Sequence, residues 1–254
     1  MAGQFEDQVV LITGGNSGIG RATAIKFAEE GAKVVVAARR VTKGRETVRA
    51  IKAAGGEAVF IKTDVSKSKD VKAMVEKTVD TYGQLDFAFN NAGTGGGGLV
   101  HELDEKVWDR VINTNLKGVW LCMKYQIAQM HKNGGGGIVN NSSVAGLLTP
   151  PGYAAYSASK HAVIAITKVA AVENAKEGIR INAVCPGWIE TPMIEKGLND
   201  PERHARILAS EPMGRVGHPQ EISDAVIWLC SKASSFVTGH ALVVDGGLAV
   251  NPLI

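Results

Sequence analysis

The segment GYAAYSASKHAV, residues 152–163, places two tyrosines before a lysine at spacings that suit acid-base chemistry. Tyr156 precedes Lys160 by four positions and Tyr153 precedes it by seven, so on a helix either phenol would share a face with the ammonium. A phenol with a pKa near ~10 needs about 3 kcal/mol of preference for its ionised form to titrate near ~7.5. A lysine charge at ~4 Å supplies about 4 kcal/mol at an effective dielectric of ~20. The spacing therefore predicts a tyrosine that exchanges a proton under the influence of a lysine.

The residues before the tyrosines separate their roles. Pro150, Pro151 and Gly152 stand directly upstream, which makes Tyr153 a first-turn or loop residue and leaves Tyr156 inside the helix. We therefore predict that Tyr156 is the acid/base and that Tyr153 forms a wall of the substrate pocket.

The elements that must position these residues alternate between β-branched runs and helical periodicity. The runs lie at 9–13, 34–38, 58–62, 85–90, 137–143, 179–184 and 241–245. Such alternation predicts an α/β fold, with a parallel sheet and helices on both faces. Two glycine runs, 94–98 and 134–137, are predicted to be flexible turns. Because ligands bind beyond the carboxyl ends of such strands, the residues after each strand are expected to carry the function.

Composition excludes several classes of function. The chain has 254 residues, 45% of them hydrophobic and 21% charged, and its net charge of +3 is not gathered into a basic tract, which argues against nucleic acid as a partner. No run of eighteen apolar residues indicates a membrane segment. Cys122, Cys185 and Cys230 are typical of reduced core residues, and neither disulfides nor a metal is needed for stability. We expect a cytoplasmic protein with a small-molecule partner and no metal site.

The first two strand ends predict a dinucleotide site. After the first strand, TGGNSGIG turns into a helix whose N-terminal N–H groups can bind a pyrophosphate; the residues are Gly14, Asn16, Ser17, Gly18, Ile19 and Gly20. After the second strand, Arg39 and Arg40 stand where an acidic residue would bind the ribose of NAD. An arginine there can pair with a 2′-phosphate, which favours NADP, although both arginines could also be solvated surface residues.

The next two strand ends are polar and have two interpretations each. Asp64, followed by Val65, can accept a hydrogen bond from the adenine amino group, or it can cap the next helix. The NNAG motif supplies Asn91, Ala92 and Gly93 to the cofactor site, although its asparagines could instead satisfy backbone groups of neighbouring strands.

These motifs, in this order, resemble those of the short-chain dehydrogenase/reductase family across essentially the whole chain. The resemblance implies one Rossmann-type doubly wound domain over residues 1–254, with a seven-stranded parallel sheet. It implies a catalytic set of Asn115, Ser143, Tyr156 and Lys160, in which Tyr156 and Lys160 also contact the cofactor. It further implies a nicotinamide-binding loop made of Pro186, Gly187, Ile189 and Thr191. Asn141 departs from the family pattern, because many members have an apolar residue before the two serines.

The function predicted is NADP(H)-dependent interconversion of a ketone or aldehyde and an alcohol, with Tyr156 as acid/base. Similar family members with an arginine after an uncharged residue usually prefer NADP to NAD. A substrate lid is expected at about 188–216, and family analogy implies a homotetramer. Three alternatives stay open: an acyl-carrier-protein-dependent 3-oxoacyl-thioester reductase, which could use Lys124, Lys132 and Arg180; an NAD-dependent sugar or polyol dehydrogenase; and a non-catalytic dinucleotide sensor, whose expected loss of Tyr or Lys is not seen.

Overall fold

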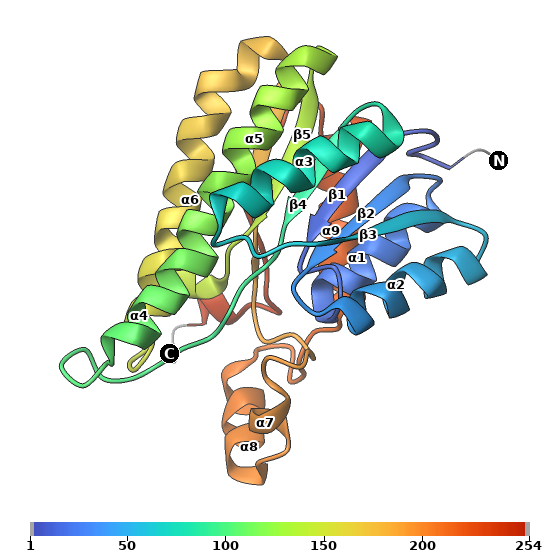
Figure 1. Cartoon of the computed structure of the whole chain (residues 1–254). Coiled ribbons are helices and arrows are strands. Elements are labelled where there is room, and N and C mark those ends of the chain that lie inside the picture. Colours follow the sequence, from blue (N-terminus) through green and yellow to red (C-terminus); the bar gives the residue numbers. More distant parts are fainter. Residues whose placement is uncertain (1–2, 252–254) are drawn as a thin grey trace.

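In residues 3–251, the part of the chain that the structure describes, seven parallel strands form one sheet in the order β3-β2-β1-β4-β5-β6-β7 (Figure 1). The structure is a computed structural model. The strands are β1 (Val9–Thr13), β2 (Lys33–Ala38), β3 (Glu57–Lys62), β4 (Phe87–Asn90), β5 (Gly136–Asn141), β6 (Ile179–Pro186) and β7 (Ala241–Val244). The predicted Rossmann-type doubly wound fold is confirmed.

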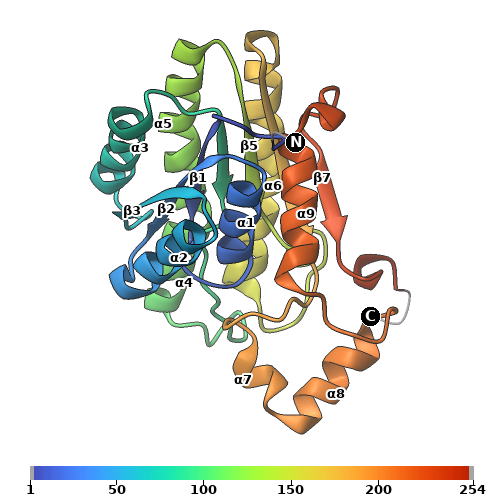
Figure 2. The same cartoon turned by 90° about the vertical axis from the view of Figure 1, so that its right-hand side faces the viewer.

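Helices cover both faces of this sheet (Figure 2). They are α1 (Gly18–Glu29), α2 (Val41–Ala53), α3 (Ser68–Tyr82), α4 (Glu105–Ile112), α5 (Gly118–Asn133), α6 (Ala154–Asn174), α7 (Glu195–Leu198), α8 (Pro201–Ser210) and α9 (Pro219–Cys230). Alternate residues of β1 point to opposite faces of the sheet and belong to two separate hydrophobic cores. Leu11 packs with α3, α5 and α6, whereas Val10 and Ile12 pack with α1, α2 and α9.

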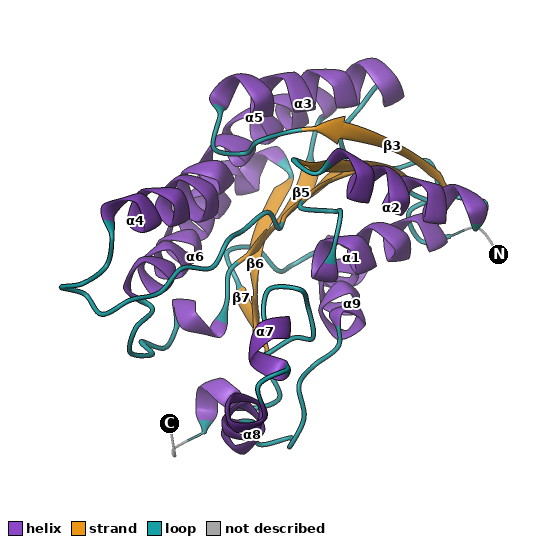
Figure 3. Ribbon diagram, turned by 60° about the horizontal axis from the view of Figure 1, so that its bottom comes forward, coloured by secondary structure: helices purple, strands orange, loops and turns teal. Residues whose placement is uncertain are grey.

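The order of the strands reverses direction between β1 and β4, and this places a crevice at their carboxyl ends. The connection from β6 to α9 carries α7 and α8, which lie beyond the sheet at the end toward which β7 points (Figures 2 and 3). The predicted lid at 188–216 corresponds to this connection, and its mobility stays a prediction.

Several predicted boundaries are wrong. The fourth strand begins at Phe87 instead of residue 85, and the sixth ends at Pro186 instead of residue 184. The fifth strand ends at Asn141, so Ser142 and Ser143 lie in the loop that follows it. The glycine run 134–137 was predicted to be a flexible turn, but only residues 134 and 135 lie outside the strand, because β5 begins at Gly136. A Cβ atom at Gly136 would lie 2.7 Å from the sulfur of Met130 and 2.9 Å from a backbone oxygen, so glycine is needed there for close packing rather than for flexibility.

The described residues contain no helix that is long and apolar enough to cross a membrane. In the same part of the chain, no three His, Cys, Asp or Glu side chains are grouped so that they could hold a metal ion. Cys122, Cys185 and Cys230 are all buried free thiols.

Candidate active site

A cleft of about 1480 Å³ opens at the carboxyl ends of strands β1 to β6. It is lined by the turn after β1, the loops after the other strands, the start of α6 and the segment that leads to α8. All the predicted site residues line it except Gly20 and Asn115. The fold therefore brings together motifs that are spread over most of the sequence.

The glycine-rich turn after β1 has the backbone geometry that a pyrophosphate requires. Gly14 and Gly18 have positive φ angles of 67° and 50°. α1 begins at Gly18 without a side-chain cap from Ser17, so its first N–H groups are available to an anion. Gly20 lies behind the turn, where a Cβ atom would collide with the Asn91 amide and the carbonyl of Gly14. These residues fit a dinucleotide, with Gly20 allowing the turn to pack against the loop after β4.

Arg40 is tied to this turn. Its Nη2 atom donates a hydrogen bond to Ser17 Oγ at 2.9 Å, and with the Asn16 amide turned to accept, Asn16 Oδ1 lies 2.9 Å from Arg40 Nε and 3.0 Å from Nη2. Arg40 is exposed to solvent, as its surface interpretation expects, but its guanidinium is bonded to the turn. A contact between Arg40 and a 2′-phosphate stays a prediction. Arg39 also lines the cleft, and its charge acts on Asp64 across it.

Asp64 caps the turn after β3 and not the next helix. Because α3 begins at Ser68 with Lys67 as its N-cap residue, the interpretation of Asp64 as a helix cap is wrong. Its Oδ1 atom accepts hydrogen bonds from Ser66 N at 3.1 Å and from Ser66 Oγ at 2.7 Å. Burial raises the pKa of the Asp64 carboxyl, but these hydrogen bonds and the charge of Arg39 outweigh burial, so the pKa lies below its usual value. Asp64 and Val65 both line the cleft, and the adenine contact stays a prediction.

Asn91 joins two strand ends. Its Nδ2 atom donates to the carbonyls of Thr13 at 3.1 Å and Gly14 at 3.3 Å, so it satisfies the backbone of a neighbouring strand. Its Oδ1 atom accepts from Asn141 Nδ2 at 3.0 Å. Asn141, the residue that departs from the family pattern, therefore connects β5 to the loop after β4. Ala92 and Gly93 continue this loop along the cleft.

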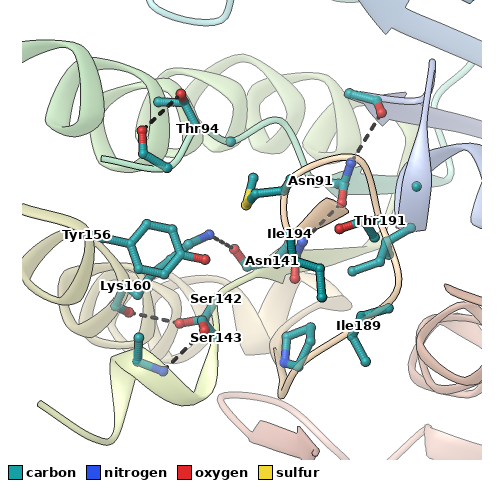
Figure 4. A pocket seen from close by; sticks show the side chains of 18 of the residues that line it. Asn91, Thr94, Asn141, Ser142, Ser143, Tyr156, Lys160, Ile189, Thr191 and Ile194 are labelled. Atoms are coloured by element: carbon teal, nitrogen blue, oxygen red, sulfur yellow. Dashed lines mark hydrogen bonds between the residues drawn. The ribbon is translucent and has the colours of Figure 1, made fainter. Parts of the chain in front are cut away.

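Tyr156, Lys160 and Ser143 converge in the cleft beside Asn141 (Figure 4). α6 begins at Ala154, so Tyr156 lies in its first turn and precedes Lys160 by one turn. Lys160 Nζ lies 5.5 Å from the centroid of the Tyr156 ring and donates a hydrogen bond to the Asn141 carbonyl at 2.7 Å. The spacing of these residues therefore produces the predicted cluster.

The protonation of this cluster differs from the prediction. Burial raises the pKa of Tyr156 above its usual value, a hydrogen bond with Ser143 opposes the rise, and Tyr153 adds to it. Burial lowers the pKa of Lys160 to about 8. In the protein alone, burial outweighs any lowering of the pKa of Tyr156 by Lys160, whose ammonium is bonded to the Asn141 carbonyl.

Asn115 is fully buried behind the cleft wall. It lies in a π-helical segment, Asn113–Lys117, that joins α4 to α5. Its Oδ1 atom accepts from Thr94 N at 2.8 Å, and its Nδ2 atom donates to Thr94 O at 3.0 Å and to Ser159 Oγ at 3.3 Å. Asn115 thus holds the loop after β4 against α6.

The loop after β6 closes against the glycine-rich turn. A Cβ atom at Gly18 would lie 3.0 Å from Thr191 Cγ2, which shows how closely the two approach. Within this loop Trp188 N donates to Glu211 Oε1 at 3.3 Å. The predicted nicotinamide-loop residues all line the cleft here: Pro186, Gly187, Ile189 and Thr191.

The end of the cleft near Tyr153 includes one residue that sequence reasoning missed. Tyr153 is the N-cap residue of α6, as its upstream prolines predicted, and its ring packs edge-on against Tyr156 at 6.4 Å. Arg203 of α8 donates from Nη2 to Tyr153 Oη at 3.3 Å. No spacing signal could have linked these two residues, because only the path of α7 and α8 brings them together. Four apolar residues also line the cleft: Leu147, Leu148, Trp188 and Met193.

The fold and the cleft define the class of protein, which is a Rossmann-type oxidoreductase that works with a nicotinamide dinucleotide. Comparison with known proteins then gives the family. The family model described as "Enoyl-(Acyl carrier protein) reductase" matches residues 14–249. The A-factor type gamma-butyrolactone 1′-reductase (1S-forming) of Streptomyces virginiae is 43% identical over 251 residues, which cover 98% of each chain. The chain belongs to the short-chain dehydrogenase/reductase family.

Two further relatives support this assignment. The cyclohexanol dehydrogenase of an Acinetobacter species is 42% identical over 247 residues, covering 97% of this chain and 96% of that protein. A crystal structure of actinorhodin polyketide ketoreductase with NADPH superimposes with a TM-score of 0.93 at 39% identity, covering 99% of this chain and 100% of the other. The protein is thus an oxidoreductase of this family.

Proposed function

We propose that the protein interconverts a ketone or aldehyde and an alcohol with NADP(H), and that Tyr156 is the acid/base. The convergence of Tyr156, Ser143 and Lys160 in one cleft with the glycine-rich turn carries this proposal. The reductase and dehydrogenase activities named for the relatives agree with it. The test is turnover of a panel of ketones and alcohols with both nicotinamide cofactors, and a protein inactive on every member would contradict it.

The proposed mechanism assigns one task to each side chain. Bound NADPH would supply the hydride. Tyr156 and Ser143 hold the carbonyl oxygen, and Tyr156, which its raised pKa keeps protonated at neutral pH, donates its proton to that oxygen. The ammonium of Lys160 stabilises the phenolate that remains. Asn115 is proposed to position a water that relays the next proton, in addition to holding Thr94.

We expect NADPH to be preferred to NADH. Two guanidiniums border the place predicted for the ribose, and each charge-assisted bond to a 2′-phosphate is worth ~1.5–3 kcal/mol, or roughly ten- to hundredfold. Arg39→Asp is expected to lower kcat/KM for NADPH at least ~tenfold and to shift preference toward NADH. Arg45→Asp, an exposed change on α2 outside the cleft, is the control. A wild-type protein that prefers NADH would refute the NADP assignment and favour the sugar or polyol dehydrogenase.

Reduction of a 3-oxoacyl thioester on a carrier protein is a second candidate, favoured by the description of the matching family model. One basic residue suggested for the carrier surface is not available, because the guanidinium of Arg180 donates to the carbonyls of Leu229, Cys230 and Ser231 at 2.8–3.2 Å. Lys124, another basic residue suggested for the carrier surface, has its Nζ atom 5.6 Å from the centroid of the Trp120 ring. Comparison of an acetoacetyl thioester on a carrier protein with cyclohexanone as substrates would separate the two candidates.

We also propose that the protein assembles as a homotetramer. Large apolar side chains are exposed on three adjacent helices: Trp108 of α4 is 42% exposed, Trp120 of α5 47% and Val172 of α6 82%. Exposed apolar patches of this kind are typical of protein interfaces. Light scattering after size exclusion is expected to give four times the mass of one chain, and Trp120→Glu is expected to give a smaller species. A wild-type monomer would contradict the proposal.

A further inference from the structure

Among the described residues, five charged side chains line the cleft, and four of them already have a place in the proposed reaction. Arg39, Arg40 and Asp64 lie at the nucleotide end, and Lys160 accompanies Tyr156. The fifth is Arg203, which approaches from α8 and contacts Tyr153. A charge at the substrate end of a largely apolar cleft requires a chemical explanation.

The position of Arg203 is determined by its neighbours. Gly197 of α7 leaves room for the guanidinium, since a Cβ atom there would lie 2.8 Å from Arg203 Nε and 3.2 Å from Cζ. Arg203 Nη2 then reaches Tyr153 Oη at 3.3 Å. The guanidinium is thus held between α7 and the tyrosine that packs against Tyr156.

The charge of Arg203 is not neutralised within the described part of the chain. None of the ion pairs there involves it, and its guanidinium donates to the hydroxyl of Tyr153. The Asp200 carboxylate accepts from the backbone N–H of Arg203. The carboxylate that lines the cleft, Asp64, belongs to the nucleotide end. A guanidinium in such a place is suited to a planar carboxylate, which it can bind through two parallel hydrogen bonds.

We propose that Arg203 is a specificity-determining residue that binds a carboxylate at the far end of the substrate. The substrates are then oxo acids, or the corresponding hydroxy acids in the oxidation direction, whose carbon chain lies along apolar residues such as Leu147 and Trp188. The inference rests on the proposed function, because Tyr156 must act on the carbonyl at the other end.

The experiment compares kcat/KM for 4-oxopentanoate and 5-oxohexanoate with kcat/KM for their methyl esters. Arg203 is exposed to solvent, so the strength of its proposed ion pair with the substrate carboxylate is expected to lie between that of a screened surface pair and that of a sheltered pair. The wild-type protein is therefore expected to prefer the acids by about tenfold. In Arg203→Gln the loss is expected to be at least ~fivefold larger for the acids than for the esters. Arg206→Gln, an exposed change on the same helix outside the cleft, is expected to keep the wild-type ratio.

A second readout is calorimetric titration of 4-oxopentanoate into the protein with NADP⁺ present. Its Kd is expected to rise by about tenfold in Arg203→Gln. Equal acid-to-ester ratios, or equal affinities, in wild type and Arg203→Gln would overturn the inference while leaving the reduction of esters intact. Failure to turn over any acid or ester would instead count against the proposed function, and the titration would still decide the role of Arg203.

Discussion

Replacing Tyr156 by phenylalanine is expected to lower kcat for ketone reduction by roughly 10²- to 10⁴-fold, the usual contribution of a positioned general acid. The substitution removes one oxygen atom, and with it the proton donor at the carbonyl. Since the ring and its packing against Tyr153 remain, NADPH is expected to bind with a Kd within about threefold of wild type. Single-turnover kinetics and cofactor fluorescence measure the two quantities separately.

Tyr153→Phe is the matched control, because it removes the other phenol oxygen in the same cleft. That oxygen accepts from Arg203 at the end of the cleft away from Lys160, so the change is expected to alter KM and substrate preference more than the chemical step. Equal and near-total losses in both variants would refute the separate roles of the two tyrosines. Retained turnover in Tyr156→Phe would refute the acid/base assignment.

The second large effect concerns Glu211, at the C-terminal end of α8. Its side chain is 5% exposed; Oε1 accepts from Trp188 N, whereas Oε2 is buried and has no hydrogen-bond partner among the described residues. Burial raises the pKa of Glu211 from 4.5 to about 7, and the charge of Asp245 adds to the rise. A carboxylate in this place is therefore better accommodated when protonated.

The sign of the pH dependence follows from proton linkage. Between pH 4.5 and about 7 the native state binds more protons at Glu211 than the unfolded state does. The free energy of unfolding is therefore expected to fall as pH rises through this range, by up to about 3 kcal/mol at pH 8. Glu211→Gln, which stays neutral, is expected to remove this decline and to be the more stable protein at pH 8.

Urea unfolding at pH 5, 6, 7 and 8 measures the effect. Glu202→Gln is the control on the same helix, because Glu202 is exposed to solvent. If the free energy of unfolding changes with pH in the same way in the wild type and in Glu211→Gln, the proposed titration of Glu211 is refuted.

Much of the fold could be predicted because the inner strands are buried on both faces, whereas the edge strands β3 and β7 are partly exposed. All five residues of β1 are buried, so the run VVLIT carries no polar interruption and its ends are easily found. Element boundaries were predicted wrongly where the residue type does not indicate what packs against it. Gly136 belongs to a strand for a steric reason that involves Met130, and nothing in a run of glycines indicates that contact.

The site was predictable where its parts are local and unpredictable where they are not. Tyr156 and Lys160 lie one turn apart, so helical spacing alone brings them together. Arg203 reaches Tyr153 only through the path of α7 and α8, and Asn141 meets Asn91 only because β5 follows β4 in the sheet. The rise in the pKa of Tyr156 could not be predicted either, because it depends on burial of the side chain, which the sequence does not show.

The position of β1 between β2 and β4 matters before the protein is complete. A chain leaves the ribosome from its N-terminus, so β1 can pair with β2 early, but its other edge waits for β4, which begins only at Phe87. During that interval the nascent half-sheet ends in an apolar strand with unpaired N–H and C=O groups, the kind of border that recruits foreign strands. A strand that is fully buried in the finished enzyme thus has, for a time during synthesis, an exposed edge.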